Sequence, residues 1–268
     1  THPRCTVLPH ADRVRDDDLA TVARELGRDL PHVRVISLTE RTAWRSDEID
    51  DAVVAAAPTD PDAPVMLQYT SGTTGNPKGV LLRHRSLVNV ARMTMAFVGV
   101  PEGAVCVNPL PMFHTAACVI GTLGPCVIGG TEVLVEKFSP GPVLDVMRAE
   151  NADVLFYVPA VLGALLEVQR TSTEPPPRLH TVMGGAANVP ASMIEAAERV
   201  FGASIINMFG QTELAPVLSA TRPGDSRRDQ LATVGHPLPH VDVKIVDPAT
   251  GDVVGLGQPG EICARGYQ

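Results

Sequence analysis

The chain has 268 residues, of which 44% are hydrophobic and 19% are charged, and its formal net charge at pH 7 is −8. This composition is typical of a soluble globular protein, and no apolar run approaches the roughly 18 residues that a transmembrane helix needs. No block rich in lysine or arginine offers the concentrated positive charge that nucleic acid requires, so we expect neither a nucleic-acid partner nor a transmembrane segment.

The five cysteines form neither a CxxC pair nor a zinc-ligand spacing. Their odd number and the lack of a secretion signal predict reduced thiols, a cytoplasmic location and no structural metal. The chain starts with Thr-His-Pro-Arg and has no initiator methionine, so we expect it to be part of a longer protein.

Helical and strand-like patterns alternate along most of the chain. We expect helices over residues 16–30, 47–57, 86–98, 142–150, 159–170 and 190–201, with Ser86 as the cap of the third. We expect strands over residues 33–38, 65–70, 105–108, 132–135, 154–158, 181–183 and 204–208. This alternation predicts βαβ units and an α/β fold with mostly parallel sheets and flanking helices.

The pattern changes near Arg222, where a polar loop is predicted over residues 222–230. A strand is then predicted over residues 241–246, followed by a turn at 247–251 and a second strand over 260–264. We therefore expect a small β-rich subdomain at the C-terminal end of the chain.

The strongest motif is the segment 69–80, Tyr-Thr-Ser-Gly-Thr-Thr-Gly-Asn-Pro-Lys-Gly-Val. Its glycines let the backbone approach a ligand closely, and its hydroxyl and ammonium groups suit a polyphosphate. The segment lacks the Gly-Lys-Ser/Thr of a Walker A loop, which disfavours a P-loop NTPase. The residues that we expect to bind the phosphates are Thr70, Ser71, Gly72, Thr73, Thr74, Gly75 and Lys78.

This segment resembles the signature loop of the adenylate-forming superfamily, which contains acyl-CoA synthetases, luciferases and the adenylation domains of peptide synthetases. Other family motifs follow in the expected order, and the chain looks most like the fatty-acyl-CoA synthetases. The resemblance implies that a carboxylic acid is activated by ATP to acyl-AMP, with release of pyrophosphate. In the intact enzyme, CoA would then accept the acyl group as a thioester.

Residues 207–213, Asn-Met-Phe-Gly-Gln-Thr-Glu, resemble the second signature of this superfamily. The resemblance implies that Phe209 stacks on adenine, that Thr212 contacts the α-phosphate and that Glu213 holds Mg²⁺. Magnesium prefers one or two carboxylates together with phosphate oxygens, which agrees with the last role. The ATP-binding residues implied here are Asn207, Met208, Phe209, Gly210, Gln211 and Thr212, and the catalytic residues are Lys78, Thr212 and Glu213.

Two further segments resemble parts of the family's substrate site. Residues 184–187, Gly-Gly-Ala-Ala, match a segment that lies against the nucleotide (Gly185, Ala186, Ala187) and the acyl group (Gly184, Gly185). Residues 109–114 match a segment that lines the acyl site, with His114 at the position of an aromatic gate. An ordinary strand-to-helix turn and a structural histidine are the alternatives.

The substrate class follows from the segment 113–118, Phe-His-Thr-Ala-Ala-Cys, which has no acidic residue. Relatives that activate amino acids carry an aspartate there to pair with the ammonium group, and a buried ammonium without a partner would be costly. The small residues Ala116, Ala117 and Gly121 suit a hydrocarbon tail. We therefore expect a fatty acid, with an aryl acid as the second choice.

Several family parts are missing from the chain. It ends before the Thr-Gly-Asp motif, the hinge and the small C-terminal catalytic domain with its lysine, and the beginning of the large domain is also absent. We expect residues 1–221 to form a nucleotide- and acyl-binding core, incomplete at its N-terminus, and residues 222–268 to begin the β-rich subdomain. Alone, the chain should bind ATP weakly or not at all and should not catalyse the reaction.

Two alternatives stay open at this point. The acyl group of acyl-AMP could pass to the phosphopantetheine of a carrier protein in place of CoA. The chain could also act as a non-catalytic nucleotide-binding module, although Lys78, Thr212 and Glu213 are all retained.

Overall fold

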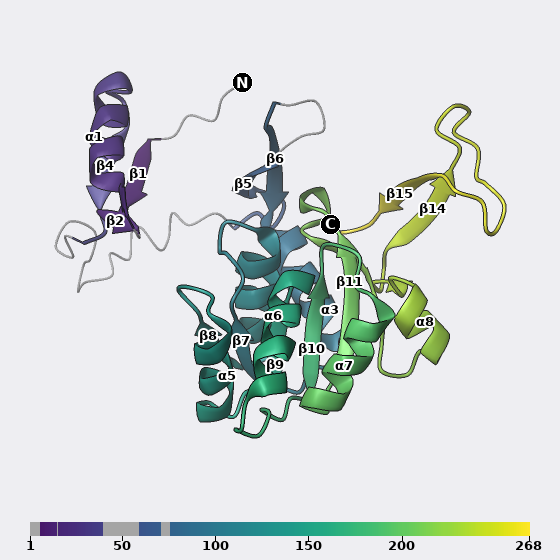
Figure 1. Ribbon diagram of the computed structural model, residues 1–268. Helices are drawn as coiled ribbons and strands as arrows, with labels where there is room; N and C mark the ends of the chain where they lie inside the picture. The colour runs from purple at the N-terminus through teal and green to yellow at the C-terminus, as the bar shows by residue number, and fades with distance from the viewer. Residues whose placement is uncertain (1–5, 15, 40–58, 71–75) are drawn as a thin grey trace. The chain divides into compact units, whose positions relative to one another are not determined.

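The computed structural model describes residues 6–14, 16–39, 59–70 and 76–268, which form two compact units, Thr1–Thr59 and Asp60–Gln268 (Figure 1). In the first unit, strand β1 (Val7–His10) pairs in parallel with β4 (Arg34–Ser37), and helix α1 (Leu19–Asp29) lies against both. Two short strands, β2 (Arg13–Val14) and β3 (Asp17–Asp18), pair before the helix.

The sequence prediction for this unit is confirmed in part. The predicted helix 16–30 starts at Leu19, because the Asp18 side chain accepts a hydrogen bond from the Thr21 backbone N–H and so caps the first turn. The predicted strand 33–38 is β4, and the predicted helix 47–57 lies outside the described residues.

The second unit is built on a seven-stranded sheet with the order β13-β12-β11-β10-β9-β7-β8. Strands β8, β7, β9, β10 and β11 run parallel, and β12 is antiparallel to its two neighbours. The strands are β7 (Val105–Asn108), β8 (Thr131–Leu134), β9 (Val154–Tyr157), β10 (Thr181–Gly185), β11 (Ser204–Gly210), β12 (Val217–Ala220) and β13 (His236–Pro237).

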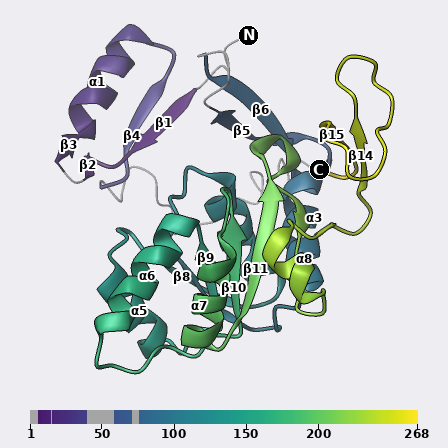
Figure 2. The same ribbon diagram turned by 45° about the vertical axis from the view of Figure 1, so that its right-hand side comes forward.

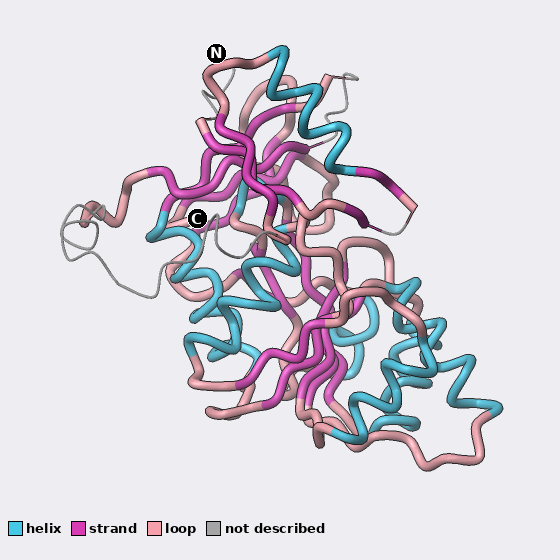
Figure 3. The backbone as a smooth tube through the Cα atoms, turned by 90° about the vertical axis from the view of Figure 1, so that its left-hand side faces the viewer, coloured by secondary structure: helices cyan, strands magenta, loops and turns pink. Residues whose placement is uncertain are grey.

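Helices cover both faces of this sheet (Figure 3). Neighbouring helices α5 (Pro140–Ala149), α6 (Pro159–Thr171) and α7 (Ala191–Phe201) form one layer. The opposite layer contains α3 (His84–Val98), the π-helix η2 (Ala116–Leu123) and α4 (Gly124–Val127). All residues of the central strands β9 and β10 are buried, which explains why their sequences are continuously apolar or small. The mostly parallel α/β fold is thereby confirmed.

Two antiparallel hairpins complete the second unit (Figure 2). Strands β5 (Pro64–Thr70) and β6 (Lys78–Arg83) form the first, and β14 (Asp242–Val246) and β15 (Glu261–Arg265) form the second. Met66, Val80 and Leu82 of the first hairpin pack against the main core. The second hairpin confirms the predicted strands near the C-terminal end, whereas the division at residues 221 and 222 stays a prediction.

Ser86 does not cap a helix, contrary to the prediction. Helix α3 begins at His84, and its first N–H groups donate to backbone carbonyls instead, His84 to Ala63 at 3.4 Å and Arg85 to Pro61 at 2.8 Å. Ser86 lies inside the helix and is 1% exposed. Its hydroxyl has no hydrogen-bond partner among the described residues.

The predicted polar loop 222–230 is also wrong in part. Residues 222–226 form the loop, but helix α8 (Arg227–Ala232) follows directly. Ser226 caps this helix by accepting a hydrogen bond from the Asp229 backbone N–H and donating its hydroxyl to the Asp229 carboxylate. No helix in the described ranges combines the length and apolar character required to cross a membrane.

Replacing Ser86 by alanine is expected to stabilise the second unit. The substitution removes a buried hydroxyl without a partner, which should raise the free energy of unfolding by about 1 kcal/mol. The control is Ser192→Ala, at an exposed position of α7. This substitution changes helix propensity alone, which should raise the free energy of unfolding by about 0.5 kcal/mol. Urea unfolding followed by circular dichroism would measure both, and a destabilised Ser86→Ala variant would contradict this interpretation.

Candidate functional site

The carboxyl ends of the parallel strands surround a cavity of about 290 Å³. Leu110 follows β7, Tyr157 ends β9, Gly185 ends β10 and Gly210 ends β11, and all four residues line it. Ligands of open α/β sheets bind at this edge, and the volume lies near the lower end of small-molecule sites. The cavity is therefore the candidate site.

Nine of the predicted site residues line this one cavity. They come from three segments far apart in the sequence, and their backbones converge at the strand ends. They are His114, Gly184, Gly185, Ala186, Met208, Phe209, Gly210, Gln211 and Thr212.

The other predicted residues lie elsewhere. Ala187 is exposed beyond the cavity, and Glu213 is exposed on the short helix η3 (Thr212–Leu214) at its margin. The Asn207 side chain does not line the cavity, because its amide donates to the Thr233 carbonyl oxygen at 3.2 Å. Thr70 and Lys78 lie on the β5–β6 hairpin, and Ser71, Gly72, Thr73, Thr74 and Gly75 lie outside the described residues.

Strands β5 and β6 lie near the same region. Thr70 and Lys78 are partners across β5 and β6, and β6 lies beside η3, which carries Thr212 and Glu213. The Gln68 side-chain amide donates to the Phe113 carbonyl oxygen at 2.7 Å, which ties the hairpin to the segment with His114. Strand β6, which begins at Lys78, and the second signature are thus adjacent in space.

Close backbone packing shapes the cavity wall at the end of β10. A β-carbon on Gly184 would collide with the Tyr157 carbonyl oxygen and lie 2.7 Å from the Tyr157 Cδ1 atom. The next turn puts Ala186 in the left-handed region at φ 65°, and Ala215, beside the cavity residue Pro216, is at φ 59°. Such backbone strain in residues other than glycine concentrates at functional sites.

The predicted gate residue lies at the rim. His114 is exposed, and its ring centroid is 4.6 Å from that of Phe113, with the planes tilted by 52°. His114 lines the cavity, and its role as a gate stays a prediction.

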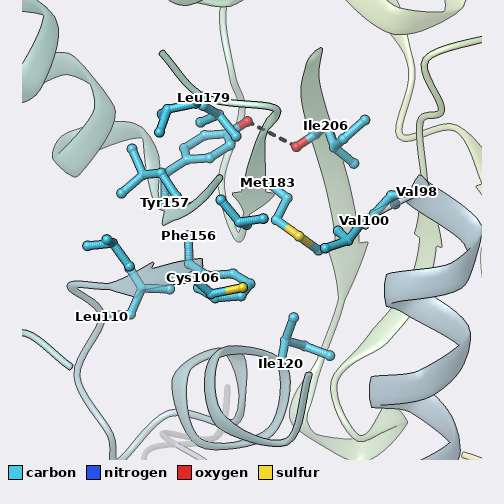
Figure 4. Close-up of a cluster of buried hydrophobic side chains, with 14 of the residues drawn as sticks. Val98, Val100, Cys106, Leu110, Ile120, Phe156, Tyr157, Leu179, Met183 and Ile206 are labelled. Atoms are coloured by element: carbon cyan, nitrogen blue, oxygen red, sulfur yellow. Dashed lines mark hydrogen bonds between the residues drawn. The ribbon is translucent and has the colours of Figure 1, made fainter. Parts of the chain in front are cut away.

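The cavity offers apolar surface and backbone groups, and no Asp, Glu, Lys or Arg is found among the described residues that line it. Its inner end is the protein core: Leu110, Ile120, Phe156 and Met183 belong to the buried cluster in Figure 4. Burial raises the pKa of the Tyr157 phenol, whose hydroxyl donates to the Ile206 carbonyl oxygen at 3.5 Å. Ligand charge must therefore be met at the rim.

Glu213 is the residue that fits a metal ion here. No cluster of three or more potential side-chain ligands occurs in the described ranges, so no cage made by the protein alone is found there. Glu213 is exposed, and within the same ranges its carboxylate makes no hydrogen bond or ion pair. A single free carboxylate suits Mg²⁺, which keeps several waters and binds substrate phosphates.

Sequence reasoning missed the inner wall of the cavity. Phe156, Tyr157 and Met183 were predicted only as strand residues, although the carboxyl ends of predicted parallel strands indicated their position. Val217 begins β12, a strand that was not predicted, and Pro216 directly precedes it.

A protein-family model described as AMP-binding enzyme matches residues 2–268. The chain is 34% identical over 205 residues to acyl-CoA ligase SID4 of Ajellomyces capsulatus, covering 75% of this chain and 35% of that protein. It is 32% identical over 283 residues to 4-coumarate–CoA ligase 1 of Arabidopsis thaliana, covering 98% and 49%. The chain thus spans half or less of these relatives.

A solved structure with the same architecture is O-succinylbenzoate coenzyme A synthetase (MenE) from Bacillus subtilis, in complex with ATP and magnesium ion. The TM-score is 0.75 and the identity 26%, with 88% of this chain and 47% of that chain covered.

A β-carbon at residue 184 is expected to disrupt the site. Because it would collide with the β9 backbone, Gly184→Ala should lower the free energy of unfolding by about 2 kcal/mol. The matched control is Gly163→Ala on α6, where the nearest atom lies 3.5 Å away and alanine favours the helix by about 1 kcal/mol. Thermal unfolding should give opposite signs, and equal effects would contradict the packing argument.

Proposed function

Because the chain belongs to the AMP-binding enzyme family, we propose that its full-length protein activates a carboxylic acid with ATP. The products of this step are an acyl-adenylate and pyrophosphate, and CoA then accepts the acyl group as a thioester. The observation that carries the proposal is the convergence of nine expected site residues on one cavity. CoA is preferred to a carrier protein because the similar proteins are named as CoA ligases or synthetases.

We assign the polar groups at the rim to the triphosphate. Lys78 and the hydroxyls of the 70–74 segment bind the phosphates, and Thr212 donates to the α-phosphate. Phe209 lies against adenine. Glu213 holds Mg²⁺, which when bound neutralises phosphate charge.

The chemistry requires no general base. A carboxylic acid is ionised at pH 7, and its oxygen attacks the α-phosphorus directly. A new carboxyl-oxygen-to-phosphorus bond forms, and the bond from the α-phosphorus to the bridging oxygen of pyrophosphate breaks. The obstacle is repulsion between two anions, so fixed donors and a cation at the rim are the groups that accelerate the reaction.

The acid that we propose is apolar, with a fatty acid first and an aryl acid second. The inner end of the cavity is formed by core side chains and by Ala116, and the described lining offers no carboxylate for a substrate ammonium group. Aryl acids stay the second choice because the Arabidopsis relative is named a 4-coumarate–CoA ligase. We also keep the cytoplasmic location and the boundary between residues 221 and 222 as proposals.

The test is carboxylate-dependent ATP–pyrophosphate exchange by the full-length protein with fatty, aryl and amino acids. We expect exchange with fatty acids, weaker exchange with aryl acids and none with amino acids. Glu213→Ala should lower the rate about a hundredfold or more, because charge stabilisation in the transition state is lost.

Glu102→Ala removes an exposed carboxylate away from the cavity and should leave the rate unchanged. If no acid supports exchange in folded protein supplied with magnesium, the enzymatic proposal is wrong. Exchange that depends on amino acids would overturn only the assigned substrate class.

A further inference from the structure

One buried side chain joins the two segments that form the acyl side of the cavity. Asn108, at the end of β7, is 0% exposed. Its amide oxygen accepts a hydrogen bond from the Leu110 backbone N–H at 3.2 Å, and its amide nitrogen donates to the Ala117 carbonyl oxygen at 3.3 Å. Asn108 therefore fixes the distance between the 109–114 segment and helix η2.

The helix is shaped to receive this amide. A β-carbon on Gly121 would collide with the Asn108 amide nitrogen and lie 2.7 Å from its Cγ atom. The turn at this point is the wide π-type, which is rare and occurs often at functional sites. Ala116 and Ile120 of the same helix line the cavity, so the position of the amide sets the position of that wall.

Glu132 on the neighbouring strand β8 holds the amide in place. Its Oε1 atom accepts from Asn108 Nδ2 at 2.9 Å and from Thr122 Oγ1 at 3.1 Å, so one carboxylate oxygen binds both β7 and η2. Within the described ranges no cation forms an ion pair with Glu132. Its contribution is therefore that of a hydrogen-bond acceptor.

We propose that Glu132 and Asn108 are positioning residues for the carboxylic acid substrate. They hold the wall formed by Leu110, Ala116 and Ile120 at the separation that the acyl group requires. The proposal rests on the acid-activating function given above. Neither residue lines the cavity, and the nucleotide side is built on β10 and β11, so their loss should affect the acid and spare ATP.

The experiment measures KM for the acid and for ATP separately, by ATP–pyrophosphate exchange with the full-length protein. Glu132→Ala should raise the KM for the acid about tenfold, because two hydrogen bonds to a charged group are lost, and leave the KM for ATP within about twofold. Glu132→Gln keeps an acceptor oxygen and should restore the KM for the acid to within about twofold of the original. Gly121→Ala pushes the same amide from the other side and should reproduce Glu132→Ala.

Glu136→Ala, at an exposed position four residues further on, is the matched control and should change neither KM. An unchanged KM for the acid in folded Glu132→Ala and Gly121→Ala would overturn the positioning role alone. An equal rise of both KM values would also overturn it, since that result indicates general disruption. If Glu132→Ala does not fold, Gly121→Ala decides. No exchange by the unmodified protein with any acid contradicts the proposed function, and the positioning role falls with it.

Discussion

The parallel pairing of β9, β10 and β11 near their carboxyl ends is the constraint on which the candidate site depends. Tyr157 is opposite Gly184, and Gly185 is opposite Met208, so the three strands end at one edge of the sheet. The chain has to leave this edge in tight turns, which explains the left-handed Ala186 and the lack of space for a side chain at Gly184. The residues at these strand ends thereby come to line the cavity.

Different interactions hold the β5–β6 hairpin in place. Asp62 accepts two hydrogen bonds at 2.9 Å from the Arg85 guanidinium, but both side chains are nearly half exposed, and such pairs contribute little to stability. The apolar contacts of Met66, Val80 and Leu82 with the core provide the larger contribution. The apolar contacts of these three residues thus hold the hairpin that carries Thr70 and Lys78.

Sequence reasoning succeeded where one local pattern determines the structure. The apolar strands β7, β9 and β11 could be predicted from their apolar residues, whereas the site role of the glycine pair at residue 184 came from the family resemblance. It failed where distant partners decide. The first N–H groups of α3 donate to backbone carbonyls before β5, so Ser86 does not cap the helix. The Asn207 side-chain amide donates to the Thr233 carbonyl oxygen and so does not line the cavity. The capping pair Ser226 and Asp229 was a local signal for α8 that the polar composition obscured.

The cavity shares its inner wall with the hydrophobic core, and this overlap limits how its specificity can change. Phe156 and Met183 are at most 1% exposed and pack inside the central sheet, so altering their size would damage the fold as well as the site. Ala116 also lines the cavity, but it is only partly buried and lies on η2, outside the sheet. A larger or smaller side chain there changes the cavity at a much lower cost in stability. Helix η2 is therefore the element through which the shape of this cavity can change most readily.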